Sequence, residues 1–193
     1  MVFTPANKVS FDPRPQMAAL FVTGFYSDLH YFSKDKAKLT AVFAPAFQLP
    51  TFFLALGADN QVLAMVGCPD GLPALQLDQR VFISVLGAIR GRFAYLMLKK
   101  FLIDHDYPFA IEPGMGSIEY VVSDVAVRGL GITGRLIEYV MRQRGYNSYV
   151  LEVASTNDRA VRLYERLGFT ELMRVPAPKR SSVGDYIYLR KQC

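Results

Sequence analysis

The sequence contains few residues of the kinds that build disulfide frameworks or metal sites. Its two cysteines, Cys68 and Cys193, lie far apart in the chain, which excludes a disulfide scaffold and a cysteine-based metal site. The two histidines, His30 and His105, have no partner at the spacing of a metal site or a catalytic triad. We therefore expect no metal, and the low cysteine content favours a reducing, cytoplasmic environment.

The chain also lacks a long uninterrupted apolar run. Four basic residues break its most apolar segment, 81–103, so this segment falls short of a membrane span: Arg90, Arg92, Lys99 and Lys100. The first fifteen residues mix polar residues and prolines where a secretory signal would need an apolar stretch. These absences predict a soluble protein without a membrane partner. A basic helix resting on a membrane surface is the alternative for 81–103.

Charge of one sign is in only moderate excess. The sequence has 22 Lys and Arg residues and 17 Asp and Glu residues, which gives a net charge of +5 and an isoelectric point near 9.2. The basic residues form no long block, and no zinc-finger, recognition-helix or aromatic RNA-binding signature is present. This balance favours a small polyanionic ligand over nucleic acid.

The chain has 193 residues, of which 51% are hydrophobic, so we expect a single domain spanning 1–193 with a substantial core. Hydrophobic periodicity predicts an α/β (α+β) chain. The predicted helices are 15–31, 36–43, 75–104, one from 129–134 to 144, and 157–166; the predicted strands are 8–11, 51–56, 61–66, 117–127, 149–153, 169–175 and 185–189. The 75–104 segment is one helix or two helices broken near 87–91, and we expect burial on more than one side.

A glycine-rich turn, Arg128-Gly129-Leu130-Gly131-Ile132-Thr133-Gly134, lies between a predicted strand and a predicted helix. Main-chain amides at a helix N-terminus attract phosphate oxygens, and glycines let a pyrophosphate approach the backbone. A turn without a ligand is one alternative. The turn also fits G-x-G-x-x-G, and Glu152 follows Gly134 by 18 residues, as in a nicotinamide-binding oxidoreductase. We favour this second alternative less, because the rest of the chain has no room for a full run of parallel βαβ units.

The segment 157–169 reads as one capped helix. Asn157 stands where the helix begins and suits an N-cap, and Gly168 suits the left-handed residue that ends it. The residues Ala160, Leu163, Tyr164 and Leu167 share one helical face. Taken alone, Tyr164 is as well explained by a buried aromatic residue as by a catalytic one.

The turn and the helix together resemble the GNAT superfamily of N-acetyltransferases. The superfamily's pyrophosphate loop reads Arg or Gln, two residues, Gly, one residue, then Gly or Ala; Arg128 and Gly131 fill the first positions, and Thr133 replaces the last, with Gly134 beside it. The segment 157–169 matches N-x-x-A-x-x-x-Y-x-x-x-G-F at every specified position. The resemblance is close over 118–172 and coarse over 1–67.

The resemblance implies a mixed, mainly antiparallel central sheet flanked by helices, with a helical insertion at about 75–104. The insertion would be extra core, a dimer surface or a lid. Acetyl-coenzyme A, as co-substrate, would lie where the strands ending near 127 and 154 diverge, and Asp124 would be a turn or bulge residue. The implied cofactor-binding residues are Ser123, Val125, Ala126, Val127, Arg128, Gly129, Leu130, Gly131, Ile132, Thr133, Gly134, Asn157 and Tyr164.

The resemblance also implies the chemistry. Tyr164 would face the sulfur of coenzyme A and protonate the departing thiolate. The run Leu151-Glu152-Val153 is similar to that of the ribosomal-protein alanine acetyltransferases, which carries a base role to Glu152; Glu119 is the alternative base, and either carboxylate could instead serve a hydrogen-bond network. The acetyl group would pass by direct attack to a small-molecule amine, a protein N-terminus or a lysine. The alternative is a regulatory acyl-coenzyme A binding module without catalysis.

Overall fold

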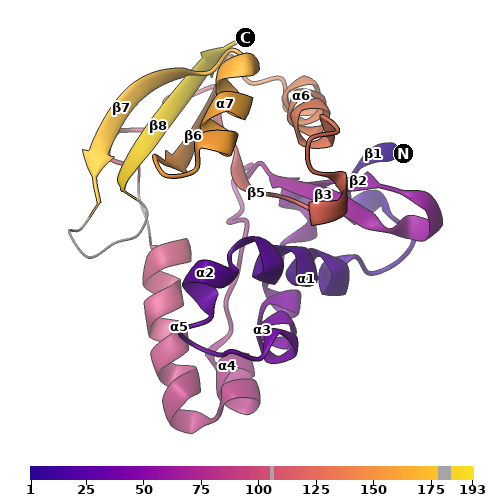
Figure 1. The fold of residues 1–193 in the computed structure, drawn as a ribbon, viewed down its shortest axis with the longest axis vertical. Coiled ribbons are helices and arrows are strands. Elements are labelled where there is room, and N and C mark those ends of the chain that lie inside the picture. Colours follow the sequence, from indigo (N-terminus) through magenta and orange to yellow (C-terminus); the bar gives the residue numbers. More distant parts are fainter. Residues whose placement is uncertain (105–106, 178–183) are drawn as a thin grey trace.

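Two four-stranded sheets and seven α-helices make up the computed structural model, which describes residues 1–104, 107–177 and 184–193 (Figure 1). The sheets stand side by side, and helices cover them from below and above in the view of Figure 1. The predicted mixed, mainly antiparallel architecture is confirmed. The predicted central sheet is divided into two parts, and this division creates the candidate site.

The first sheet is antiparallel throughout and has the order β1-β2-β3-β5. Its strands are β1 (Val2–Pro5), β2 (Phe52–Leu56), β3 (Val62–Gly67) and β5 (Glu119–Ser123). The predicted hairpin at 51–66 is confirmed, whereas the predicted strand at 8–11 is wrong. The first strand is β1, because pairing with the distant strand β2, from Val2 opposite Leu56 to Pro5 opposite Phe53, decides which residues extend.

Three helices pack on the first sheet: α1 (Arg14–Gly24), α2 (Tyr26–Leu29) and α3 (Lys36–Phe43). The predicted helix at 36–43 is confirmed, and its first turn is held by the Asp35 carboxylate, which accepts from the amides of Ala37 and Lys38. Aromatic side chains fill the core between these helices and the sheet, and the ring of Phe21 lies 4.8 Å from that of Phe43.

The second sheet has the order β4-β6-β8-β7. Its strands are β4 (Met115–Ser117), β6 (Ser148–Ala154), β7 (Thr170–Pro176) and β8 (Asp185–Gln192). Only the short β4–β6 pair is parallel among the described strands. The helix α7 (Asp158–Arg166) packs on this sheet, whereas α6 (Ile132–Arg144) packs mainly on β2 and β3 of the first sheet. Both helices and both sheets contribute to a second apolar core.

The two sheets part at Ile118, the residue between β4 and β5. The Ile118 amide still donates to the carbonyl of Val150 at 2.8 Å, but the next residues belong to β5 and pair with β3 instead. The strand predicted over 117–127 is therefore two strands in different sheets, followed by a 3₁₀ turn at Val125–Val127. Beyond this point β5 and β6 diverge, as the resemblance implied.

A β-bulge lies at the start of β5. Between the pairs Gly67–Glu119 and Met65–Val122, β5 has one residue more than β3. The bulge places Tyr120 at φ 49°, in the left-handed region that costs energy for a residue with a side chain. The Tyr120 hydroxyl donates to the carbonyl of Leu102 at 2.7 Å, which secures the bulge against the end of the inserted segment.

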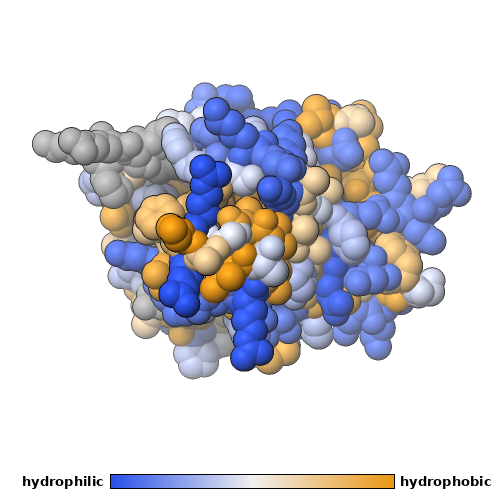
Figure 2. All heavy atoms as spheres, turned by 90° about the horizontal axis from the view of Figure 1, so that it is seen from below, coloured by the Kyte–Doolittle hydropathy of each residue, from blue (hydrophilic) through white to orange (hydrophobic). Residues whose placement is uncertain are grey.

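The insertion is two helices, α4 (Gln79–Leu86) and α5 (Ala88–Leu102), broken at Gly87, whose φ is 88°. The two-helix interpretation is confirmed. Gly91 lets the helices approach, since a Cβ there would clash with the carbonyl oxygen of Phe82. The expectation of burial on more than one side is wrong for the outer face of α5, because Ile89, Phe93, Leu96 and Phe101 are exposed. Figure 2, seen from below, shows hydrophobic and hydrophilic surface side by side at this end of the molecule.

Within the described ranges, no helix combines the length and the apolarity that crossing a membrane requires.

Candidate active site

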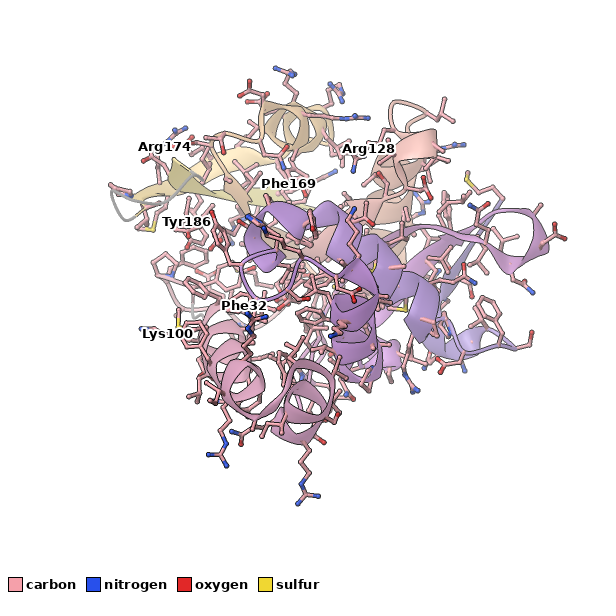
Figure 3. All side chains as sticks on the ribbon, turned by 60° about the horizontal axis from the view of Figure 1, so that its bottom comes forward. Phe32, Lys100, Arg128, Phe169, Arg174 and Tyr186 are labelled. Atoms are coloured by element: carbon pink, nitrogen blue, oxygen red, sulfur yellow. The ribbon has the colours of Figure 1, made fainter. Side chains whose placement is uncertain are left out.

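The glycine-rich turn forms an open N-terminus for α6. Gly129 has φ 88° and Gly131 has φ 73°, and a Cβ at either position would have only open space within 4 Å. The first hydrogen bond of the helix runs from the Arg135 amide to the Gly131 carbonyl, so the amides before it point out of the helix end. Arg128 is exposed beside them (Figure 3). This arrangement fits an anionic group such as a pyrophosphate.

The residues of this turn divide into inward and outward positions. Ile132 is buried in the second core, and a Cβ on Gly134 would touch Leu163 and Leu167 of α7 at 3.4 and 3.7 Å. These two residues can therefore offer a ligand only their main chain. Leu130, by contrast, is 65% exposed, so an apolar side chain stands at the mouth of the turn.

The 3₁₀ turn before it already uses most of its own amides. The Asp124 carboxylate accepts from the Ala126 amide at 2.8 Å, the Asp124 carbonyl accepts from the Val127 amide, and the Asp124 amide donates to the carbonyl of Leu63. Asp124 is thus a turn residue, as expected. The resemblance predicts that main-chain amides of 123–127 contact the cofactor. The bonds above leave the amides of Ser123 and Val125 for this role.

Tyr164 lies on the inner face of α7 and is buried. Its ring packs on Phe169 at 6.0 Å, and within the described part of the chain its hydroxyl has no hydrogen-bond partner. Burial raises the pKa of the phenol above its usual value, which keeps the hydroxyl protonated at neutral pH. Asn157 caps the same helix through a bond from the Ala160 amide at 3.2 Å. The contact of Asn157 with a cofactor stays a prediction.

Glu152 stands on β6 directly opposite Tyr188 of β8. Burial raises the pKa of Tyr188 first, and the hydrogen bond between its hydroxyl and the Glu152 carboxylate raises it further. Leu151 and Val153 belong to the apolar core, so Glu152 projects from the opposite face of the second sheet, away from α7. Glu152, the predicted base, is therefore positioned by Tyr188 of the adjacent strand β8.

Glu119 begins β5, immediately after the point where the sheets part. Its carboxylate accepts from the Ser117 hydroxyl at 2.7 Å. Burial raises the pKa of Glu119, and the bond from Ser117 lowers it by a smaller amount. Glu119 and Glu152 both act electrostatically on the phenol of Tyr107 and raise its pKa, after the larger effect of burial. The two predicted carboxylates thus both lie near enough to Tyr107 to act on it electrostatically.

Sequence reasoning missed three aromatic residues beside these carboxylates: Tyr107, Phe109 and Tyr188. Their ring centroids lie 5.4 to 5.9 Å apart in all three pairs. The available signals were the paired aromatics of Tyr107-Pro108-Phe109 and the alternation Tyr186-Ile187-Tyr188 in a predicted strand. Neither signal indicates the other, because Tyr107 and Tyr186 are 79 positions apart in the sequence.

Other chemistries find no support in the described residues. Burial raises the pKa of the Cys68 thiol to about 12, so it is protonated and a poor nucleophile at neutral pH, and Cys193 is exposed at the chain end. No group of His, Cys, Asp and Glu in the described ranges could hold a metal ion, and His105 lies outside them. With one short parallel pair, the dinucleotide-binding interpretation lacks its sheet.

Two surface hollows lie away from these residues. One of about 510 Å³ lies between the end of α3 and α4, and one of about 650 Å³ lies at the C-terminal end of α6. Neither is lined by Glu119, Glu152 or Tyr164. We place the candidate site by its chemistry, at the parting of the strands.

Comparisons with known proteins agree with this geometry. A sequence model of the acetyltransferase (GNAT) family matches residues 22–169. An N-acetyltransferase from Staphylococcus aureus Mu50 shares the fold with a TM-score of 0.65 and 14% identity, covering 99% of this chain and 100% of its own. A structure described as histone acetyltransferase HPA2 and related acetyltransferase from Corynebacterium glutamicum has a TM-score of 0.64 and 18% identity, and the match covers 99% of this chain and 95% of that one. A chain of the NatC complex bound to Gag peptide and coenzyme A has a TM-score of 0.56 and 15% identity, and the match covers 100% of this chain and 98% of that one. No curated protein sequence matches the chain.

Proposed function

Because the chain belongs to the acetyltransferase (GNAT) family and is an acyltransferase, we propose that it moves the acetyl group of acetyl-coenzyme A directly onto a primary amine. The observation that carries this proposal is the parting of β5 and β6 beyond Ile118. The open glycine turn lies just after β5, and Glu152 lies on the diverging part of β6. A thioester entering between the strands would meet both.

Main-chain amides would provide most of the hydrogen bonds to coenzyme A. Its pyrophosphate would accept hydrogen bonds from the amides at the start of α6, where Gly129 and Gly131 leave open space. The pantetheine arm would run along the diverging edge of β5, and the amide of Ser123 or Val125 would donate to the thioester oxygen. Coenzyme A is present in one relative of the same fold, the NatC complex.

The transfer needs the amine to lose its protons and the departing thiolate to gain one. An amine in water is mainly protonated, so Glu152 accepts a proton from the ammonium, directly or through water, and the neutral nitrogen then attacks the thioester carbonyl carbon. As the new carbon–nitrogen bond forms, the carbon–sulfur bond breaks and the thiolate accepts the proton of the Tyr164 hydroxyl. The nitrogen then releases its second proton to water, which leaves the neutral amide, and water returns a proton to the Tyr164 phenolate. The raised pKa of Tyr164 supports this role, since it keeps that proton available at neutral pH.

Glu119 would be the second carboxylate of the acceptor site rather than the base. Its Ser117 bond occupies one oxygen, and burial raises its pKa, which disfavours its charged form. It would contribute a negative field that draws an ammonium group into the site. Replacing Glu152 and Glu119 singly by Gln separates these roles: the Glu152 change should lower kcat, and the Glu119 change should mainly raise KM for the amine.

Thermal unfolding with ligands tests the cofactor first. Acetyl-coenzyme A and coenzyme A should each raise the melting temperature, whereas NAD should leave it unchanged. Thiol release with an amine panel then tests transfer. Stabilisation by acetyl-coenzyme A without thiol release for any amine would instead support the regulatory acyl-coenzyme A binding module, and stabilisation by NAD alone would contradict both.

A further inference from the structure

The face of the second sheet that carries Glu152 is distinct from the face that packs on α7. Side chains alternate along a strand, so Leu151 and Val153 point into the apolar core while Glu152 points to the other side. On β8 the paired residue Tyr188 shares the side of Glu152, and Ile187 and Leu189 share the core side. This second face therefore presents a carboxylate and a phenol next to each other.

Residues that follow the insertion cover this face. Tyr107 and Phe109 follow α5 closely in the chain, and their rings pack on Tyr188 at 5.9 and 5.7 Å. The ring of Phe109 meets that of Tyr188 at 89°, an edge-to-face arrangement that fixes both rings. We call Tyr107, Phe109 and Tyr188 the aromatic wall. Figure 3 shows Tyr186, from the same strand as Tyr188, on the side towards the end of α5 that Lys100 marks.

The aromatic wall is electrically neutral but lies in a negative field. Burial raises the pKa of both tyrosines, so neither phenol ionises at neutral pH. Glu152 is hydrogen-bonded to the wall through Tyr188, and the charges of Glu119 and Glu152 both reach Tyr107. Tyr188 is buried, whereas Tyr107 and Phe109 are partly exposed. Negative charge beside these two partly exposed rings is the combination that attracts an organic cation, because each ring face carries negative electrostatic potential.

We propose that the aromatic wall and the carboxylates Glu119 and Glu152 select the acceptor: a small primary alkylammonium with an apolar, preferably aromatic, body. This inference rests on the proposed function and names its substrate class. The ammonium would face Glu152, and the body would pack against Tyr107 and Phe109. An amino sugar would place hydroxyl groups against aromatic carbon, where they lose their hydrogen bonds to water, and this loss disfavours it. The segment that follows the insertion therefore serves as a wall of the acceptor site.

Isothermal titration of the coenzyme A complex tests the proposal without requiring turnover. Phenethylamine should bind at least about tenfold more tightly than glucosamine, which corresponds to about 1.4 kcal/mol. Tyr107→Leu keeps an apolar side chain but removes the ring face, and it should weaken phenethylamine by about fivefold or more while coenzyme A affinity stays the same. Tyr107→Phe keeps the ring and should change phenethylamine affinity by less than about threefold. Tyr31→Leu is the matched control, because Tyr31 is 79% exposed and outside the wall.

The outcomes separate this inference from the proposed function. Wall-dependent binding of phenethylamine without acetyl transfer would support the inference and contradict the function. Acetylation of glucosamine or of a lysine peptide with a kcat/KM equal to that of phenethylamine, unaffected by Tyr107→Leu, would overturn the inference and leave the function standing. Equal phenethylamine affinity in wild type and Tyr107→Leu, with both proteins folded by their melting curves, would also overturn it.

Discussion

The Ser117 hydroxyl donates to the Glu119 carboxylate at 2.7 Å across the residue where the two sheets part. Ser117 is the last residue of β4 and Glu119 is the first of β5, so this bond joins the ends of two strands that belong to different sheets. It satisfies one oxygen of a carboxylate that burial otherwise disfavours in its charged form. The two residues between which the fold opens are thus also bonded to each other.

Glu119→Gln should stabilise the protein at neutral pH. The folded-state pKa of Glu119 is raised, so between its unfolded and folded pKa values the folded state binds more protons than the unfolded state, and stability falls as pH rises through that window. The Gln side chain does not ionise, so the variant does not lose stability as pH rises through that window. Urea unfolding should give Glu119→Gln the higher free energy of unfolding at pH 7.5, with the difference shrinking at pH 4. A difference that grows on acidification would contradict the assignment.

Tyr164→Phe should slow turnover by on the order of 10²-fold, the usual contribution of a general acid. Because the Tyr164 hydroxyl has no partner among the described residues, its removal should break no protein hydrogen bond and leave the melting temperature within about 1–2 °C. Coenzyme A affinity should also stay unchanged. Steady-state kinetics with a thiol reagent measures the effect, and an unaltered kcat would exclude the acid role.

Gly131→Ala should weaken coenzyme A binding. Its φ of 73° makes an alanine there unfavourable by about 1 kcal/mol, and the new methyl group would stand in the space where the pyrophosphate is expected. Gly145→Ala is a matched control, because Gly145 ends the same helix with φ 65° and also faces open space. Both variants should lose similar stability in urea, and only Gly131→Ala should lose affinity by titration. Equal affinities would contradict pyrophosphate binding at this turn.

Arg144→Met should destabilise the fold by about 2 kcal/mol. The guanidinium donates to the carbonyls of Pro50 and Cys68, both at 2.9 Å, and to the Asp70 carboxylate at 3.2 Å, so it fastens α6 to the ends of β2 and β3. Removing it leaves two carbonyls without a partner. Arg142→Met, on an exposed position of the same helix, should change the free energy of unfolding by less than about 0.5 kcal/mol. Similar losses in both variants would show that the bonds contribute little.

Local features of the chain were predictable because their causes are local. Asn157 caps α7 and Gly168 ends it at φ 86°, as the spacing of 157–168 predicted. Gly87 separates α4 from α5 for the same reason, since its φ of 88° suits few other residues. The family resemblance rests on such segments, and it carried the expectation of an acyltransferase that the family match confirms.

The sequence by itself determined the capped helices, the hairpin of β2 and β3 and the glycine turn, since caps, turns and side-chain periodicity act over a few residues. Only the tertiary structure decided where β1 lies, that 117–127 divides at Ile118, and that Tyr107 and Phe109 reach Tyr188. Strand pairing and ring packing join residues dozens of positions apart, and no short segment encodes its partner. The proposed acceptor side of the candidate site rests on such contacts, so it could be inferred only from the folded chain.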